Sequence, residues 1–229
     1  MKKLTFTLIC TLSIVLQIQA QKSQVNLFSD TPYTTYTGVV EGGDLKYEQV
    51  KGTPYTNDSF QEATLVGDSI GYLIRYDAYK QVMQLREKDY HGEAKILQPT
   101  KSYRFDLVGK NQSYIAVTYP SLGKGFGLVI WNNNTGVELI KRQVVTFQKG
   151  RKGNGGYQVE IADAFSEIKE SYFIRLSKDE KLIEIPSSKK EVFKFLGDEI
   201  KKKAKENKLN PNKEEDLIQL ISFKYGTSE

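Results

Sequence analysis

The sequence predicts a mainly β (α+β) protein: an antiparallel curved sheet or barrel-like meander followed by a C-terminal helix-turn-helix segment. Three observations support this fold class. Short alternating segments, separated by glycine, asparagine and serine, recur through most of the chain. Aromatic residues suited to cross-strand pairs are abundant, with 14 Tyr and 11 Phe. After Pro186 the apolar period changes to that of a helix.

Residues 1–20 are expected to be a secretory signal peptide. Lys2 and Lys3 precede an apolar stretch over 4–16, and the small residue Ala20 precedes a polar start. The apolar stretch is shorter than the about 20 residues that a membrane-spanning helix needs. We therefore expect export to the periplasm, the outer membrane or the extracellular medium, with no transmembrane segment in the mature chain.

Composition excludes several kinds of chemistry. The chain has one Cys, Cys10, and one His, His91, and cleavage after Ala20 would remove the Cys. No cofactor or metal site is expected, because zinc sites and iron–sulfur clusters need several such ligands. Loss of Lys2 and Lys3 lowers the count of Lys and Arg from 33 to 31 against 28 Asp and Glu, so the net charge falls from +5 to +3. That charge is too small to favour nucleic acid as a partner.

The β domain is expected over 41–186, after an extended N-terminal lead-in over 21–40. Its clearest alternation of apolar and polar residues lies at 72–76 and at 103–107. Because most turns between successive segments are short, neighbouring strands should pair as hairpins. The expected strands are 72–76, 103–107, 113–119, 125–131, 137–147, 157–161, 172–176 and 181–185.

The C-terminal helical segment is expected over 187–229, packed on the β domain. Ser188 followed three residues later by Glu191 is a capping box, and Gly197 is expected to break the helix that follows. Asn210-Pro211 should end this stretch before a second helix. The apolar positions of the two stretches are Val192, Leu196, Ile200 and Ala204, then Leu217, Ile218, Leu220 and Ile221.

Four segments match the motifs of a known family. They are a GxPY start at 52–55, a hairpin at 73–79 similar to LRYNxYxDE, a strand at 125–129 similar to GYFxVL, and a helical tail at 206–220. On these segments, which span nearly the whole mature chain, it resembles a family of small secreted or periplasmic proteins of Bacteroidota. The resemblance implies export but no particular activity. Gln81-Val82-Met83-Gln84 replaces the acidic pair of that family, so any role of those acids is absent.

The most distinctive polar cluster is Arg75-Tyr76-Asp77-Ala78-Tyr79, with Tyr55 expected to dock on the same sheet. As a ligand site, Arg75 would clamp an anion and the tyrosines would stack on a sugar or peptide, with Asp77 beside them. In the structural interpretation, Arg75 pairs with a neighbouring carboxylate, and Tyr76 and Tyr79 fill the sheet around a hairpin turn. We favour the structural interpretation and keep the ligand site as the alternative.

No residue is assigned a catalytic role. His91 is the single imidazole and lies in a turn-like context, and the chain has no GxSxG elbow. The glycine-rich segments at 123–127 and 150–156 lack the features of phosphate-binding loops. A glycosidase needs only two carboxylates, so a carboxylate-based hydrolase acting on polysaccharide stays open.

Two further features are candidates for surface chemistry. Lys201, Lys202, Lys205 and Lys208 form a basic cluster on the tail helix, which would contact anionic lipid headgroups. The favoured interpretation of that cluster is a solvated helix face. Asp68-Ser69-Ile70 resembles the acceptor site for O-glycosylation in this bacterial group.

Together these observations favour an exported cell-envelope protein that acts as a binding or assembly component rather than as an enzyme. Its partner would be an envelope protein or a glycan. The two alternatives are the polysaccharide hydrolase and a peripheral membrane-surface protein that uses the basic C-terminal helix.

Overall fold

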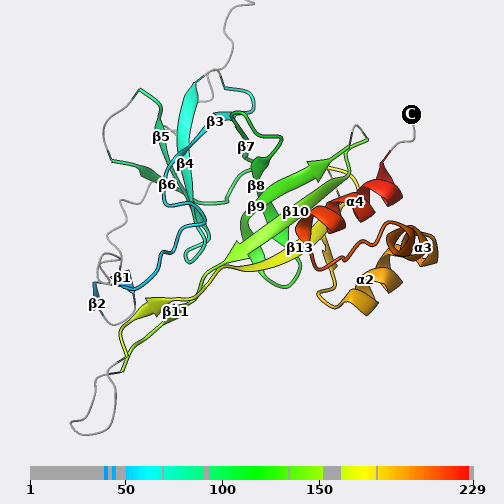
Figure 1. Cartoon of the computed structure of the whole chain (residues 1–229). Coiled ribbons are helices and arrows are strands. Elements are labelled where there is room, and N and C mark those ends of the chain that lie inside the picture. The colour runs from blue at the N-terminus through cyan, green and yellow to red at the C-terminus, as the bar shows by residue number, and fades with distance from the viewer. Residues whose placement is uncertain are drawn as a thin grey trace, which may run out of the picture. The chain divides into compact units, whose positions relative to one another are not determined.

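Most of the expected β domain and helical tail is described by the structure, a computed structural model (Figure 1). The expected signal peptide, Ser69, His91 and residues 157–160 of the expected strand at 157–161 lie outside the described residues, and Ile161 forms a β-bridge with Arg151. No helix in the described part is long and apolar enough to cross a bilayer. The described residues, which all belong to the unit Tyr33–Glu229, are 39–40, 43–44, 50–68, 70–89, 93–133, 135–151, 161–178 and 180–226.

The described chain forms strands through the β domain and helices in the tail. The strands are β1 (Val39–Val40), β2 (Gly43–Asp44), β3 (Gln61–Leu65), β4 (Gly71–Asp77), β5 (Val82–Glu87), β6 (Lys95–Leu97), β7 (Arg104–Leu107), β8 (Ser113–Tyr119), β9 (Gly123–Asn132), β10 (Glu138–Val144), β11 (Phe147–Gln148), β12 (Ala164–Phe165), β13 (Lys169–Arg175) and β14 (Ile183–Ile185). The helices are α2 (Lys189–Leu196), α3 (Asp198–Glu206) and α4 (Glu214–Tyr225).

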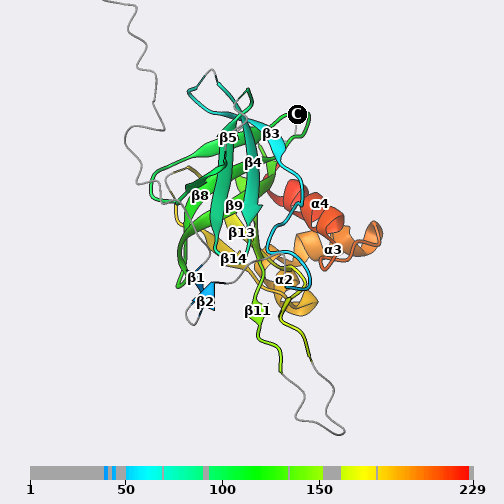
Figure 2. The ribbon, with the colours of Figure 1, turned by 90° about the vertical axis from the view of Figure 1, so that its left-hand side faces the viewer.

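A ten-stranded antiparallel sheet has the order β14-β13-β10-β9-β8-β7-β3-β4-β5-β6. Strands consecutive in the chain pair from β3 to β6 and again from β7 to β10, and the β3–β7 pair joins these two meanders. β13 then pairs with β10, and β14 with β13 (Figure 2). The predicted mainly β fold with an antiparallel sheet and C-terminal helices is confirmed, and the sheet is not closed into a barrel.

The sheet is strongly curved. This follows from contacts of β4 and the β4–β5 turn with β9 and β10, although β3, β7 and β8 lie between them in the strand order. The Val145 amide donates to the Ala78 carbonyl at 3.0 Å, and the Gln81 amide nitrogen donates to the Gln143 carbonyl at 3.0 Å. The Tyr76 ring lies 6.4 Å from that of Phe126 on β9. These contacts hold the first meander against the second.

The strand pattern read from the sequence is confirmed where alternation is strong and is incomplete elsewhere. Tyr72, Ile74 and Tyr76 of β4 are at most 2% exposed, as their alternation predicts. The expected strand at 137–147 instead divides into β10 and β11. Sequence reasoning missed β3, β5, β6 and β12, of which β6 and β12 are only three and two residues long.

Two glycines of β9 are required by an aromatic side chain from β8. The Tyr119 hydroxyl donates to the Phe126 carbonyl at 3.0 Å, so its ring lies across the neighbouring strand. A Cβ on Gly127 would lie 2.5 Å from Ile140 Cγ2 and 2.6 Å from Tyr119 Oη, and one on Gly125 would lie 3.1 Å from the Tyr119 ring. The glycine-rich segment at 123–127 therefore accommodates a buried tyrosine within a strand.

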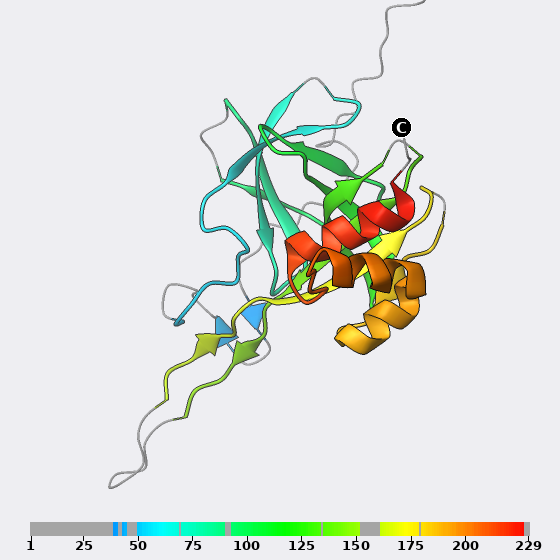
Figure 3. The ribbon, with the colours of Figure 1, turned by 45° about the vertical axis from the view of Figure 1, so that its right-hand side comes forward.

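The expected helical tail is present, and Gly197 breaks its first stretch into α2 and α3 (Figure 3). The Ser188 Oγ accepts a hydrogen bond from the Glu191 amide at 3.3 Å, as the capping box predicts. Gly197 has φ of 97°, a conformation that favours glycine. Side chains near both ends of α4 meet the sheet: Lys141 forms an ion pair with Glu214 at 2.7 Å, and Asn133 donates to the Tyr225 carbonyl at 2.6 Å.

Candidate functional site

Arg75, the centre of the predicted ligand cluster, makes its contacts within the protein. Its guanidinium carbon lies 3.7 Å from the centroid of the Tyr55 ring and 4.6 Å from that of Phe60. Its Nε and Nη2 donate to Gln84 Oε1 at 3.1 and 2.8 Å, and Nη1 donates to the Asp58 carbonyl at 3.0 Å. The structure thus brings Arg75 and Tyr55 together, and a glutamine amide stands where a carboxylate was expected.

The other members of that cluster point elsewhere. Tyr76 is 2% exposed inside the curved sheet, where burial raises its pKa well above the ordinary value, and the neighbouring tyrosines Tyr119 and Tyr114 add to this. Asp77 Oδ1 accepts hydrogen bonds from the backbone amides of Tyr79 and Lys80, at 3.0 and 2.9 Å, and so fixes the β4–β5 turn.

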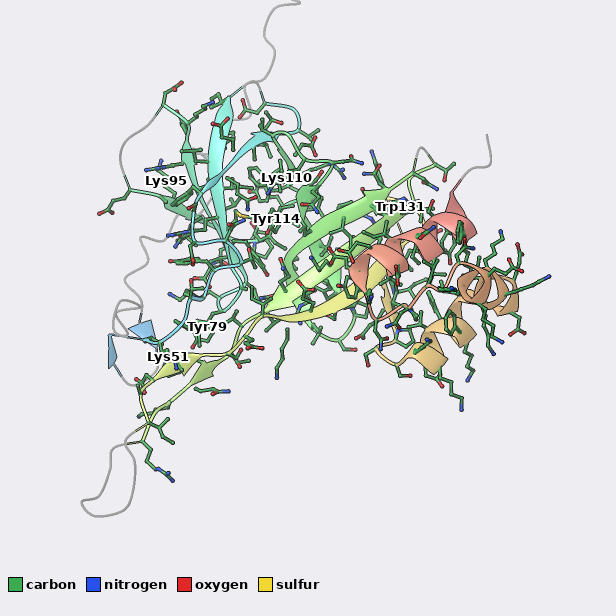
Figure 4. The ribbon with its side chains drawn as sticks, in the orientation of Figure 1. Lys51, Tyr79, Lys95, Lys110, Tyr114 and Trp131 are labelled. Carbon is green, nitrogen blue, oxygen red and sulfur yellow. The ribbon has the colours of Figure 1, made fainter. Side chains whose placement is uncertain are left out.

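Tyr79, labelled in Figure 4, lies over the β11–β12 pair. Its ring centroid is 6.4 Å from that of Phe147 and 5.4 Å from that of Phe165. These aromatic contacts anchor the hairpin turn, as the structural interpretation of the cluster predicts. A ligand site that uses Tyr76 together with Arg75 would need both faces of β4, because side chains alternate along a strand.

A larger candidate site is a groove of about 810 Å³, which we name the sheet groove. Three loops and strand ends surround it: the β6–β7 loop, the second half of β8 and the segment before β14. Lys124 at the start of β9 donates to the Thr100 carbonyl at 3.4 Å and so connects two of its walls. The lining residues are Pro99, Thr100, Lys101, Ser102, Ala116, Val117, Thr118, Tyr119, Pro120, Lys124, Arg175, Glu180, Lys181 and Leu182.

The lining of the sheet groove is cationic and rich in hydroxyl groups. Lys101, Lys124, Arg175 and Lys181 face it, while Glu180 is the only carboxylate among its described lining residues. The side chains of Thr100, Ser102 and Thr118 add hydroxyl groups that can donate or accept hydrogen bonds. The groove therefore suits a polar ligand that carries negative charge.

Arg175 is held in place by a carboxylate that is almost completely buried. The Glu138 side chain is 5% exposed, and its Oε2 accepts hydrogen bonds from both Nε and Nη2 of Arg175. Its other oxygen, Oε1, accepts a hydrogen bond from Arg104 Nη1 at 2.7 Å. Arg104 also donates to Asp106 Oδ1 and to Ser113 Oγ, both at 3.0 Å. Four strands thus contribute to one network that orients the groove arginine.

The predicted basic cluster of the tail is partly brought together. Lys201, Lys205 and Lys208 line a groove of about 930 Å³ between α2 and α3, which we name the lysine groove. Lys202, the fourth predicted residue, is not among the residues that line it. The full lining is Lys189, Lys190, Phe193, Lys194, Asp198, Lys201, Ala204, Lys205, Lys208, Leu209 and Asn210.

A pair of carboxylates lies where α4 begins. Glu170 Oε2 and Glu214 Oε2 lie 3.2 and 3.0 Å from the Tyr172 hydroxyl oxygen and share its single proton. Lys141 forms ion pairs with both acids, at 3.4 and 2.7 Å. Burial, followed by these two carboxylates, raises the pKa of Tyr172, so its hydroxyl stays a proton donor.

Comparison with known proteins adds no relative to this description. No family model, no curated protein and no solved structure matches the chain significantly. The resemblance to secreted proteins of Bacteroidota therefore stays a prediction. Within the described residues no group of three or more His, Cys, Asp or Glu side chains is arranged to hold a metal ion.

Sequence reasoning did not identify the residues of the sheet groove or its buried carboxylate. Arg104, Glu138 and Arg175 lie on β7, β10 and β13, and no short motif connects them. One signal was present: Glu138 interrupts an otherwise apolar stretch, Val137 to Ile140, and a charged residue in such a position needs a partner when buried. The sequence does not show which arginines provide that partner.

Proposed function

We propose that this chain is an exported cell-envelope protein that binds a negatively charged polar partner in the sheet groove. The observation that carries the proposal is the groove itself: four cationic side chains and several hydroxyl groups line one concave surface supported by a sheet. Concave sites with a few convergent polar groups are the usual form of ligand sites. The partner would be an acidic glycan or an acidic segment of an envelope protein.

The network around Glu138 supports a binding role for Arg175. An arginine fixed by a buried carboxylate loses little side-chain freedom when a ligand arrives, so its hydrogen bonds to an anion cost less entropy. Burying Glu138 is itself costly unless its partners stay in place, which keeps Arg104 and Arg175 oriented. The guanidinium suits an acidic ligand because it can donate two parallel hydrogen bonds to one carboxylate or phosphate.

Site-specific photo-crosslinking in intact cells tests this proposal. A photoreactive amino acid at Thr118, which is exposed and lines the groove, should give one discrete adduct in the envelope fraction. The same amino acid at Thr64, exposed on β3 and outside the groove lining, is the matched control. Mass spectrometry of the adduct distinguishes a glycan from a protein.

The triple variant Lys101→Gln/Lys124→Gln/Lys181→Gln should remove the Thr118 adduct while the protein remains folded and exported. Equal adducts from Thr118 and Thr64, or an adduct unchanged in the triple variant, would contradict binding in the groove. Turnover of a glycan, peptide or ester by the purified protein, lost on substitution of one acid or hydroxyl, would contradict the non-enzymatic role.

The alternative of a polysaccharide hydrolase has one observation in its favour, the Glu170–Glu214 pair. Two carboxylates that hydrogen-bond to the same hydroxyl are close enough for glycoside chemistry. However, Lys141 connects both acids, and the neighbouring pocket, at about 220 Å³, is smaller than usual ligand pockets. Glu170→Gln should abolish polysaccharide cleavage under this alternative and leave groove crosslinking unchanged under our proposal.

A further inference from the structure

The lysine groove combines a cationic rim with an apolar floor. Lys189, Lys190 and Lys194 come from α2, and Lys201, Lys205 and Lys208 come from α3 and the turn after it. Against these six lysines the described lining has a single acid, Asp198. The sharp turn at Gly197 folds the two helices toward each other and so turns two separate basic segments into one site.

The groove lysines have few partners, in contrast to Lys203 and Lys224 of the same tail. Lys203, outside the groove, forms an ion pair with Glu199 at 3.2 Å and lies 5.7 Å from the centroid of the Phe223 ring. Lys224 donates to the Phe195 carbonyl at 3.1 Å. Around the groove, Lys194 alone has a carboxylate within reach, Glu191 at 4.0 Å, as far as the described residues show. The positive charge around the groove is therefore largely uncompensated.

The floor of the groove is apolar. Phe193 and Leu209 line it and are only half-buried, and Ala204 between them is 2% exposed. Lysine side chains place their methylene stems on such a surface and direct their ammonium groups outward. Apolar side chains inside a ring of cations fit an amphiphile with a negatively charged head.

From this arrangement we infer that the lysine groove binds an anionic lipid headgroup at a membrane surface. The cations would bind the phosphate of the headgroup, and Phe193 and Leu209 would contact the glycerol and the first methylenes of the acyl chains. This site is separate from the sheet groove, because the two share no lining residue. It is independent of the proposed function, since each site can be disabled without the other.

An anionic lipid explains the groove better than a soluble polyanion does. A polyanion such as polyphosphate would use the six ammonium groups alone and would gain nothing from the half-buried Phe193 and Leu209. The two occupants therefore make different predictions for substitution of the floor. Removal of the lysines weakens both kinds of binding, whereas removal of the apolar floor weakens only lipid binding.

Vesicle co-sedimentation tests the inference. The protein is purified from cells that express the full chain, so that it is in the form that the cell produces. Vesicles with 30 mol% phosphatidylglycerol in phosphatidylcholine should bind the protein, and pure phosphatidylcholine vesicles should not. The groove variant Lys190→Gln/Lys201→Gln/Lys205→Gln should bind about 100-fold more weakly, since each lysine near an anionic surface strengthens binding about fivefold. Phe193→Ser should weaken vesicle binding and leave retention of polyphosphate unchanged.

A control triple variant removes the same charge from exposed lysines outside the groove: Lys178→Gln/Lys202→Gln/Lys213→Gln. Its binding to vesicles should change by no more than a few-fold. Equal loss in the two triple variants would overturn the groove as the site, as would equal binding to both vesicle compositions. If Phe193→Ser binds vesicles as tightly as the wild type, and the groove variant binds both vesicles and polyphosphate more weakly, the ligand would be a soluble polyanion and not a lipid. If Phe193→Ser does not fold, Leu209→Ser tests the same floor.

Discussion

Two arginines of this protein, Arg75 and Arg175, show different ways in which a fold uses a guanidinium. Arg75 lies on β4 opposite Gln84 of β5 and makes its hydrogen bonds within one hairpin and the segment before it. Arg175 lies on β13, is held by Glu138 of β10, and lines the sheet groove. The first arginine closes a local structure, whereas the second pairs with a neighbouring strand that lies far away in the sequence, and it faces a concave surface.

The two arginines differ in how far away their partners lie in the sequence, and only the nearby partner can be predicted from a local motif. Residues 75 and 84 are nine positions apart, so their meeting follows from one hairpin. Glu138 meets Arg104 across 34 positions and Arg175 across 37, through strands whose order depends on the whole sheet. A distinctive local motif therefore predicts contacts within one hairpin, whereas a buried charge predicts a partner that lies far away in the sequence.

Removal of the buried carboxylate is expected to have the largest effect on the stability of the fold. Glu138→Gln should lower the free energy of unfolding by about 3 kcal/mol, because Arg104 and Arg175 would lose their common charged partner in a mostly buried site. Urea denaturation followed by circular dichroism measures the change. A loss below about 0.5 kcal/mol, the size expected at an exposed pair, would show that the network does not hold the sheet together.

A second change tests the packing between β8, β9 and β10, near the floor of the sheet groove. Gly127→Ala should lower the free energy of unfolding by about 2 kcal/mol, because its Cβ would lie 2.5 Å from Ile140 Cγ2 and 2.6 Å from Tyr119 Oη. Gly136→Ala is the contrasting substitution, since its Cβ would meet nothing within 4 Å, although its φ of 94° leaves backbone strain. Gly127→Ala/Tyr119→Phe should not recover the loss, because the clash with Ile140 Cγ2 remains and the buried hydrogen bond to the Phe126 carbonyl is removed.

Arg75→Met is the matching substitution at the arginine whose partners lie nearby in the sequence. We expect a loss of about 1 kcal/mol in the free energy of unfolding, from the contact with the Tyr55 ring and the hydrogen bonds to Gln84. Crosslinking from Thr118 should be unchanged, since Arg75 is outside the groove lining. Loss of the adduct in a folded Arg75→Met protein would restore the ligand site that the sequence suggested.

Much of the fold followed from local patterns in the sequence. The alternation in β4 and β7, the capping box before α2 and the break at Gly197 each depend on neighbouring residues, so composition and spacing predict them. The strand order did not follow, because the β3–β7 pair and the addition of β13 beside β10 are contacts between segments far apart in the chain.

The candidate sites show the same division. All four lysines of the predicted cluster were found from their spacing on one helix and the turn after it, and three of them, Lys201, Lys205 and Lys208, line the lysine groove. The groove also contains three lysines of α2 that the spacing did not predict: Lys189, Lys190 and Lys194. They lie near the α3 lysines because the turn at Gly197 brings α2 and α3 together. For the sheet groove, no local pattern connects the β6–β7 loop with the segment before β14, so the sequence could not predict that they line one surface.

A pH-dependent prediction concerns Lys80, in the turn whose backbone Asp77 fixes. Burial lowers the pKa of Lys80 to about 8, although the Asp77 carboxylate opposes the shift. Between pH 8 and about 10.4, the ordinary lysine pKa, the unfolded chain holds a proton that the folded chain has released. Because the unfolded state then binds more protons, the free energy of unfolding should rise with pH over this interval.

Lys80→Met removes the titrating group, so its stability relative to the wild type should be highest at pH 7 and should decline by pH 9.5. Denaturation of both proteins at the two pH values measures this difference, and a difference independent of pH would show that the turn leaves the Lys80 ammonium hydrated.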